Sequence, residues 1–513
     1  MRRLFLLIYG LSGAAGLIYE ILWTRQLTLL MGHTTAAVSA VLAAFMGGLA
    51  IGAALGGRAA PQVSERRALQ IYAGLELTVA ASALLIPWAL VLSRPLLAAA
   101  YADGAGTWFG VTRLVLSLAM LGVPTAAMGA TLPFAARWYL RTMERAGAEA
   151  GDLYAGNTIG AATGAGLASF VLVPMLGVRT TLWIAASVNV VAAIVAWAIS
   201  RRDVDVSGVG RPFRAGNEPR KSKRPADKKS HLTQQPAGTA SLTLAAAALA
   251  LTGFAALVSE VVWARVLALI IGPTTYAFGL MLTTFILGLA AGSFAGARLS
   301  ARVRDARPSL ALVVAAFGVA SGAALWRMSG LPIEVAQSIA TASGTPFRSV
   351  LWRQGIVAAS LLLPVAIALG AAFPLAVGVA ARTRERVARD LAILYASNTA
   401  AAIAGSLAAG FVLIPRSGLR PTIVGMVVLA GLGAGTLAVA GGIARSRVLV
   451  LAAVSVAAVA LAWTAPRWDH ALLSSGAYKY ASYLRVPDLE AVLTAGSLEY
   501  YKEGAASTVT VRR

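Results

Sequence analysis

Thirteen apolar stretches of about 20 residues recur along almost the whole chain, and they restrict its fold more than any other feature. A helix needs about 20 apolar residues to cross a hydrocarbon layer about 30 Å thick. The expected spans are 4–27, 35–57, 69–92, 110–136, 153–175, 180–199, 242–270, 275–297, 309–326, 353–380, 393–415, 421–443 and 448–465. Hydrophobic residues make up 58% of the sequence and charged residues only 13%, too little polar surface to enclose a soluble globule. The sequence therefore predicts an all-α polytopic membrane protein with the lipid bilayer as its main partner.

Basic residues predict the orientation of these spans. The net charge is +23, which in a soluble protein would indicate nucleic-acid binding, but basic residues also collect on the cytoplasmic face of membrane proteins. One set of alternate loops carries 28 of them and the opposite set six. We therefore expect no nucleic-acid partner, a plasma (inner) membrane location, and a cytoplasmic N-terminus and basic linker 200–240. Thirteen spans put the tail 466–513 outside, and a miscount of one span would reverse its side.

An internal repeat joins the first six spans to the next six. Tyr19 to Arg25 (YEILWTR) matches Ser259 to Arg265 (SEVVWAR) at an offset of 240, and 153–158 (LYAGNT) matches 394–399 (LYASNT) at 241. Six spans per unit is an even number, so both copies enter the membrane in the same sense. The predicted domains are a first six-helix repeat (1–199), a disordered linker (200–240), a second repeat (241–443), a thirteenth helix (444–465) and a tail (466–513).

Glycines recur every four residues in the second span of each repeat, at Gly48, Gly52 and Gly56 and again at Gly288, Gly292 and Gly296. Such spacing lets two helices approach closely, so we assign these glycines to packing.

Two six-helix units joined by a long basic loop resemble the layout of major facilitator transporters. The stretch 47–58 also resembles the glycine-and-arginine motif of that family, without its usual Asp.

Two acidic residues stand at equivalent positions inside apolar spans, Glu20 and Glu260. A carboxylate there costs several kcal/mol unless it is paired or hydrated. Arg25 and Arg265 follow five residues later, about 140° around the helix, so they do not pair with these acids directly. We expect the pairs Glu20–Arg113 and Glu260–Arg353, or pairs crossed between the repeats. Two interpretations stay open: a structural ion pair, or a substrate or proton site.

The other candidates for an intramembrane polar site are Glu76, which has no counterpart in the second repeat, and Asn157 and Asn398, which suit hydrogen bonds between helices. Tyr19, Trp23 and Trp263 form a candidate aromatic wall. The two tryptophans are expected to anchor their helices at the membrane interface, and the alternative is a cation–π wall for an amine. Because the chain has no Cys and its three His share no ligand spacing, we expect no catalytic residues, no metal site and no cofactor.

Several segments resemble the membrane domain of fused spermidine synthase-like proteins: 11–25 (LSGAAGLIYEILWTR), 45–52 (FMGGLAIG), 129–133 (GATLP) and 154–160 (YAGNTIG). In that family a multi-span domain precedes a soluble aminopropyltransferase domain. The tail 498–511 (LEYYKEGAASTVTV) resembles the first β-hairpin of that domain, and its alternating end predicts a strand independently. The sequence stops at Arg513, before the glycine-rich loop and acidic residues of the family. We therefore expect no aminopropyl transfer by this chain alone.

Three hypotheses follow. The first is a membrane domain that transports or binds a small polar or amine solute, with a separate synthase domain as a further partner. The second is a membrane-anchored aminopropyltransferase truncated before its catalytic core, so whether the chain is an enzyme stays open. The third is a scaffold without transport.

Overall fold

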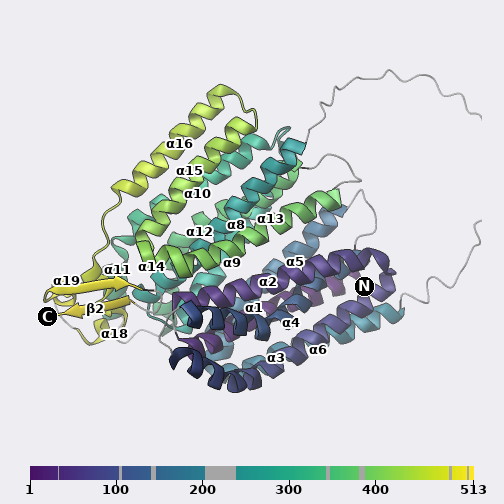
Figure 1. The fold of residues 1–513 in the computed structure, drawn as a ribbon, viewed down its shortest axis with the longest axis horizontal. Helices are drawn as coiled ribbons and strands as arrows, with labels where there is room; N and C mark the ends of the chain where they lie inside the picture. The colour runs from purple at the N-terminus through teal and green to yellow at the C-terminus, as the bar shows by residue number, and fades with distance from the viewer. Residues whose placement is uncertain are drawn as a thin grey trace, which may run out of the picture.

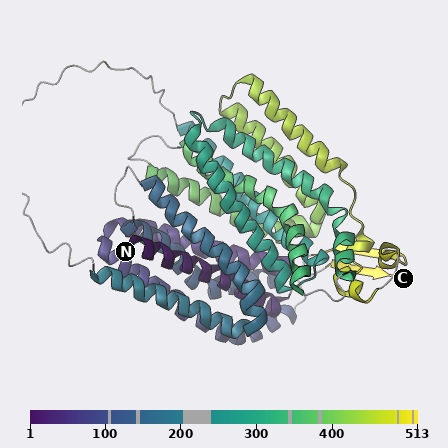
Figure 2. The ribbon, with the colours of Figure 1, turned by 180° about the vertical axis from the view of Figure 1, so that it is seen from behind.

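The computed structural model describes residues 1–32, 34–102, 107–139, 146–202, 239–341, 347–380, 387–484, 488–504 and 508–513. The expected disorder of linker 200–240 falls almost wholly outside these residues. Long helices fill the described chain and lie in two groups, one purple to blue and one teal to green (Figures 1 and 2). The all-α polytopic fold class is therefore confirmed.

The first half contains six long helices. They are α1 (Arg2–Met31), α2 (Thr35–Ala59), α3 (Glu65–Ala102), α4 (Thr107–Tyr139), α5 (Ala146–Leu167) and α6 (Val173–Arg202), with a 3-10 turn η1 (Ala60–Gln62) after α2 and a π-helical segment η2 (Ala168–Leu172) after α5. Gly177 interrupts α6 with a φ of 76° and separates the fifth predicted span from the sixth.

The second half repeats this order. It consists of α8 (Thr239–Ile270), α9 (Thr275–Arg302), α10 (Arg307–Met328), the short α11 (Leu331–Ala340), α12 (Phe347–Ala380), α13 (Val387–Ala408), the π-helical η3 (Ala409–Leu413), α14 (Ile414–Ser417) and α15 (Leu419–Ala440). The thirteenth predicted span is α16 (Arg445–Thr464), which packs on α10 and α15. Twelve helical stretches of the described chain are long and apolar enough to cross a membrane, and one of them, Leu153–Arg202, holds the two spans divided at Gly177.

Equivalent helices pack in equivalent pairs. Helix α1 contacts α5 as α8 contacts α13, α2 contacts α4 as α9 contacts α12, and α3 contacts α6 as α10 contacts α15. The halves meet where α2 contacts α13 and where α5 contacts α9, which is again an equivalent pair. This packing confirms two parallel six-helix repeats related by a pseudo-twofold axis.

The predicted packing role of the recurring glycines is also confirmed. A Cβ on Gly52 would overlap the backbone carbonyl of Ala126 in α4, and one on Gly292 would overlap that of Ile367 in α12. We call Gly48, Gly52 and Gly56, with their counterparts Gly288, Gly292 and Gly296, the glycine seams. They let the α2–α4 and α9–α12 backbones touch, because no side chain stands between them.

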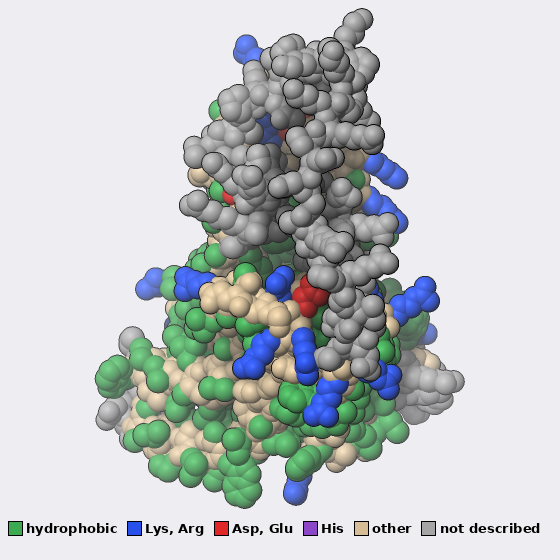
Figure 3. Space-filling view, turned by 90° about the vertical axis from the view of Figure 1, so that its right-hand side faces the viewer, with side chains coloured by type: hydrophobic (Ala, Val, Ile, Leu, Met, Phe, Trp, Pro, Cys, Tyr) green, Lys and Arg blue, Asp and Glu red, His purple; other side chains and the backbone are tan. Residues whose placement is uncertain are grey.

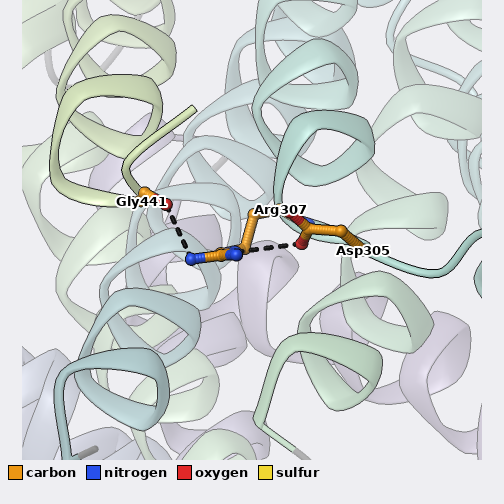
Figure 4. A network of polar contacts seen from close by, with 3 residues as sticks. All are labelled: Asp305, Arg307 and Gly441. Atoms are coloured by element: carbon orange, nitrogen blue, oxygen red, sulfur yellow. Dashed lines mark hydrogen bonds and ion pairs between the residues drawn. The ribbon is translucent and has the colours of Figure 1, made fainter. Parts of the chain in front are cut away.

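Two ends of the bundle can be distinguished (Figure 1). The linker end carries the N-terminus and the start of the linker, and arginines gather there around the bundle (Figure 3). Arg307 belongs to this end: its Nε donates to Asp305 Oδ1 at 2.9 Å and its Nη1 to the Gly441 carbonyl at 2.8 Å (Figure 4). Burial alone would raise the pKa of Asp305, but the hydrogen bonds and charge of Arg307 outweigh it and hold that pKa below its ordinary value.

The opposite end carries the tail, so we call it the hairpin end (Figure 1). The tail forms α17 (His470–Leu473), α18 (Ala477–Tyr480), the 3-10 turn η4 (Ala481–Tyr483), α19 (Leu489–Thr494) and the antiparallel strands β1 (Leu498–Glu503) and β2 (Thr508–Arg512). The predicted hairpin is therefore confirmed. Its short helices pack on α11, which the sequence did not predict.

Candidate functional site

A cavity of about 630 Å³ lies between the two halves at the hairpin end. Its lining comes from α1 (Ile21 to Leu29), α8 (Val261 to Ala268), the beginnings of α2 and α9, and Val173 and Pro174 after η2. Helices α1 and α8 are counterparts in the repeat, as are α2 and α9, so the cavity lies about the pseudo-twofold axis. Its volume is within the usual range for small-molecule sites.

Tight turns join the helix pairs α1–α2 and α8–α9 beside the cavity. Gly32 and Gly272, with φ of 93° and 99°, follow α1 and α8. The Thr34 hydroxyl then accepts from the backbone N–H of Ala37 at 2.9 Å, and the Thr274 hydroxyl accepts from that of Ala277 at 3.1 Å. These caps start α2 and α9 directly at the cavity wall.

Two arginines project into the lining from equivalent positions, Arg25 on α1 and Arg265 on α8. Arg25 is exposed and donates to the hydroxyl of Thr275 in the other half. Arg265 is half-buried, and its Nη2 donates to Thr508 Oγ1 of the hairpin at 3.2 Å. The described lining contains no acidic side chain, so the cavity has a positive character.

Hydroxyl groups supply the remaining polarity of the cavity. Six threonines belong to the lining: Thr24, Thr28, Thr34, Thr35, Thr274 and Thr275. The hydroxyls of Thr24 and Thr35 are buried without a hydrogen-bond partner, although each residue is no more than 5% exposed. A buried polar atom without a partner is costly, so these two hydroxyls are available to a bound solute.

Glu20 and Glu260 lie beside this cavity rather than in its lining. The lining of α1 begins at Ile21 and that of α8 at Val261, one residue after each acid. The acids are 4% and 5% exposed, and their carboxyl groups are close enough for the charges to interact across the halves. Glu260 Oε1 has no hydrogen-bond partner. The structure thus brings together two buried carboxyls from equivalent positions.

The expected ion pairs Glu20–Arg113 and Glu260–Arg353, and the alternative of pairs crossed between the repeats, are wrong. Among the described residues, ion pairs join Arg307 to Asp305 and Arg327 to Glu334. The Arg113 guanidinium instead lies 4.0 Å from the ring centre of Phe109, and its Nη1 donates to Thr34 Oγ1 at 3.1 Å. Arg353 is exposed on α12. The sequence argument failed because it compared depth alone, whereas the acids face the other half and Arg113 faces the turn after α1.

Glu76 is the centre of a hydrogen-bond network in the first half that has no counterpart among the described residues of the second. It is fully buried on α3, and its two carboxyl oxygens accept from Ser12 Oγ of α1 at 2.6 Å and from Asn189 Nδ2 of α6 at 2.5 Å. Asn189 Oδ1 in turn accepts from the Tyr19 hydroxyl at 2.8 Å. These bonds join three helices through a carboxyl group that has no ion-pair partner among the described residues.

The aromatic candidates are core residues. Trp23 and Trp263 are 0% and 1% exposed, so the expected interfacial anchoring is wrong. Tyr19 stacks on Trp23 with ring centres 4.9 Å apart, and neither lines the cavity. Tryptophan on a helix has the same sequence signature whether it faces lipid headgroups or another helix, which is why the sequence could not separate the two.

Asn157 and Asn398 take equivalent positions beside glycines of the neighbouring helix. A Cβ on Gly13 of α1 would come within 2.5 Å of Asn157 Oδ1, and one on Gly253 of α8 within 2.7 Å of Asn398 Oδ1. Neither Asn lines the cavity. Both therefore lie at helix contacts, and the expected hydrogen bonds between helices stay a prediction.

Sequence reasoning missed the two π-helical segments and the hairpin contacts. Ser169 of η2 packs against Gly279 of α9, and Gly410 of η3 packs against Ser39 of α2, so both segments lie where the halves meet. π-helical turns are frequent at functional sites. The matching runs ASFVL and AGFVL are a signal that the repeat contained, but apolar periodicity does not distinguish a π turn from an α turn.

The hairpin is fixed to the bundle through Glu503. Its Oε2 accepts from the Leu419 backbone N–H at 2.5 Å, at the start of α15, and its Oε1 accepts from the Tyr501 hydroxyl at 2.7 Å. Burial and the neighbouring Glu503 raise the pKa of Tyr501, so its hydroxyl keeps its proton and donates. Tyr501 also stacks on His470 with ring centres 3.9 Å apart. These contacts hold the hairpin beside Arg265 at the mouth of the cavity.

Comparisons with known proteins give structural likeness alone. No family model matches the sequence, and no curated protein matches it. The fold is similar to a bacterial homologue of the iron transporter ferroportin in an outward-facing state with soaked iron, at 13% identity and a TM-score of 0.48, covering 89% of this chain and 99% of that one. It is also similar to a mutant of the nucleoside transporter NupG, at 14% identity and a TM-score of 0.47, covering 89% and 100% of the two chains. Within the described residues, no group of three or more His, Asp or Glu is placed to hold a metal ion.

Proposed function

We propose that this chain is a membrane transporter whose cavity between the two halves receives a small polar solute. The observation that carries the proposal is the lining: equivalent helices of both halves enclose one cavity on the pseudo-twofold axis, and its mainly apolar wall carries two arginines and six threonines. Parallel-repeat transporters bind their solutes at the repeat interface and expose them by rocking one half against the other. A scaffold needs neither a cavity lined by arginines nor unpartnered hydroxyls inside a bundle.

The orientation belongs to the same proposal. We infer that the linker end faces the cytoplasm of a plasma (inner) membrane. Arginines gather at that end (Figure 3), as expected for cytoplasmic loops. The cavity would then open to the outside in this conformation, beside the hairpin.

The buried carboxyls Glu20 and Glu260 are proposed to take part in transport rather than to hold the bundle together. They come from equivalent positions in the two halves, and within the described part of the chain no ion pair joins either of them to the cationic partner that a structural role would supply. Glu20→Gln and Glu260→Gln keep the shape and remove the charge. Transport should fall while thermal stability stays the same or rises. Intact transport with a lower Tm would instead make the pair structural.

A cavity-filling variant tests the transport proposal itself. Ala264→Trp puts a large side chain into the cavity from α8, and Ala297→Trp, on α9 outside the lining, is the matched control. Solute levels would be compared inside cells that lack the gene and cells that carry each variant. We expect the native chain and the control to change the level of the same solutes, and Ala264→Trp to behave like the deletion. If all strains match, the scaffold hypothesis replaces the transporter.

A second candidate function is the membrane anchor of an aminopropyltransferase. The observation that favours it is the hairpin, which forms as the resemblance to spermidine synthase-like proteins implies. The test is aminopropyl transfer to putrescine by membranes that contain the full natural gene product. Product formed only when this gene is present would support the anchor, and no product would exclude it.

A further inference from the structure

We propose that the solute is a small organic or inorganic oxyanion, bound through its carboxylate or phosphate oxygens by Arg25 and Arg265. This inference rests on the proposed transport function and deepens it. It also departs from the amine that the sequence suggested, because the acids that would attract an amine lie outside the lining.

The first argument is the charge of the lining. Two guanidinium groups reach the cavity from equivalent positions in the two halves, and no acidic side chain accompanies them in the described lining. Arginine binds carboxylate and phosphate oxygens through paired N–H donors. A cationic solute would meet like charges at the mouth, which disfavours its entry.

The second argument is that neither arginine is neutralised by an ion pair among the described residues. Arg25 bonds to the hydroxyl of Thr275, and Arg265 bonds to that of Thr508. Glu503 is near enough to attract Arg265, but its two oxygens already accept from Leu419 N–H and Tyr501. Both guanidinium groups therefore keep donors for a solute.

The third argument comes from the hydroxyls. Thr24 and Thr35 are nine-tenths or more buried, line the cavity and have unpartnered oxygens. A hydroxyl can donate to an anion that an arginine already holds. Arginine and hydroxyl donors together form a site with several donors for oxygen atoms, which is the chemistry that an oxyanion requires.

The test uses the full chain in proteoliposomes with three labelled probes of similar small size: succinate, inorganic phosphate and putrescine. We expect uptake of succinate or phosphate and none of putrescine. Arg25→Gln and Arg265→Gln should each reduce that uptake at least about tenfold, the loss of one charge-assisted contact, and the double variant should abolish it. Arg179→Gln, at an exposed arginine on α6 outside the lining, should leave uptake unchanged.

A second measurement guards against variants that fold poorly. Leu29→Cys puts one thiol into the lining of this Cys-free chain, and methanethiosulfonate reagents carrying a sulfonate or a trimethylammonium group report the local charge. The anionic reagent should react faster with Leu29→Cys. Adding Arg25→Gln and Arg265→Gln should reverse this preference. The control Ser329→Cys, at the same end, should show neither the preference nor its reversal. Uptake of putrescine alone would overturn the anion inference but would still support the proposed transport function. Failure of succinate and phosphate to enter, with an unchanged reagent preference in the double variant, would also overturn it.

Discussion

The two halves of this molecule share a backbone plan but not their polar interior. Both have glycine seams, positive-φ glycines after their first helices and a π-helical segment at the shared interface. Both first helices also carry an acid, Glu20 or Glu260, with an arginine five residues later. Among the described residues, the Glu76 network belongs to the first half alone, and of the two equivalent arginines it is Arg265 of the second half that contacts the hairpin. The shared features are those that close helix packing requires, whereas the differences involve buried polar contacts that each half has formed separately.

The glycine seams give the largest expected effect. Gly52→Ala and Gly292→Ala each press a methyl group into a backbone carbonyl of the facing helix. Overpacking costs up to about 3 kcal/mol, and occasionally more. Both should lose most folded protein, measured as the monodisperse peak in detergent and its Tm. The matched control is Gly57→Ala, where a Cβ meets open space and the second half already carries Ala297. A seam variant as stable as Gly57→Ala would contradict the shared packing.

The Glu76 network gives the next largest effect and sharpens the difference between the halves. Glu76→Ala copies the residue at the equivalent position, Ala316, and leaves Ser12 and Asn189 without their acceptor. Loss of hydrogen bonds to a buried group costs about 2 kcal/mol, so the Tm should fall. Glu76→Gln keeps one acceptor oxygen and should lower the Tm less. Glu65→Ala, at an exposed position on α3, should not change the Tm. Equal Tm values for all three would show that the network adds no stability.

The hairpin contact in the second half predicts a smaller and local effect. Glu503→Gln weakens the charge at the start of α15 and the bond from Leu419 N–H, an effect of about 1 kcal/mol. Amide hydrogen exchange of β1 and β2 should become several times faster while the membrane helices keep their protection. Glu499→Gln, on the same strand and exposed, is the control. Unchanged exchange in Glu503→Gln would mean that other contacts hold the hairpin.

The smallest effect concerns Asp305 at the linker end. Its pKa is held below its ordinary value in the folded chain, so its contact with Arg307 stabilises the fold above the unfolded pKa and is lost as the pH falls through the folded one. The pair is exposed, so it contributes no more than about 1 kcal/mol. Asp305→Asn should lower the Tm slightly at pH 7 and not at pH 3. If the Tm difference between Asp305→Asn and the native chain grew as the pH fell, it would contradict the lowered pKa of Asp305.

The sequence predicted the spans, the thirteenth helix and the hairpin because each depends on local apolar length or alternation, and it predicted the repeat because matching segments recur at a nearly constant offset. It also identified Glu20, Glu260, Arg25 and Arg265 as unusual, because charge inside an apolar run is visible without a structure. It could not pair them correctly. Which face of a helix a carboxyl occupies depends on how the two halves cross, and that information is not present in either repeat alone.

The most direct test of the central claim is the accessibility of Thr24, inside the cavity, from both sides of the membrane. Thr24→Cys in sealed vesicles of each orientation would be treated with an impermeant thiol reagent, with Ser329→Cys and Gln62→Cys marking the hairpin end and the linker end. If the halves alternate about the cavity, Thr24→Cys reacts from both sides while each marker reacts from one. Reaction of Thr24→Cys from a single side would contradict a transporter built on this cavity.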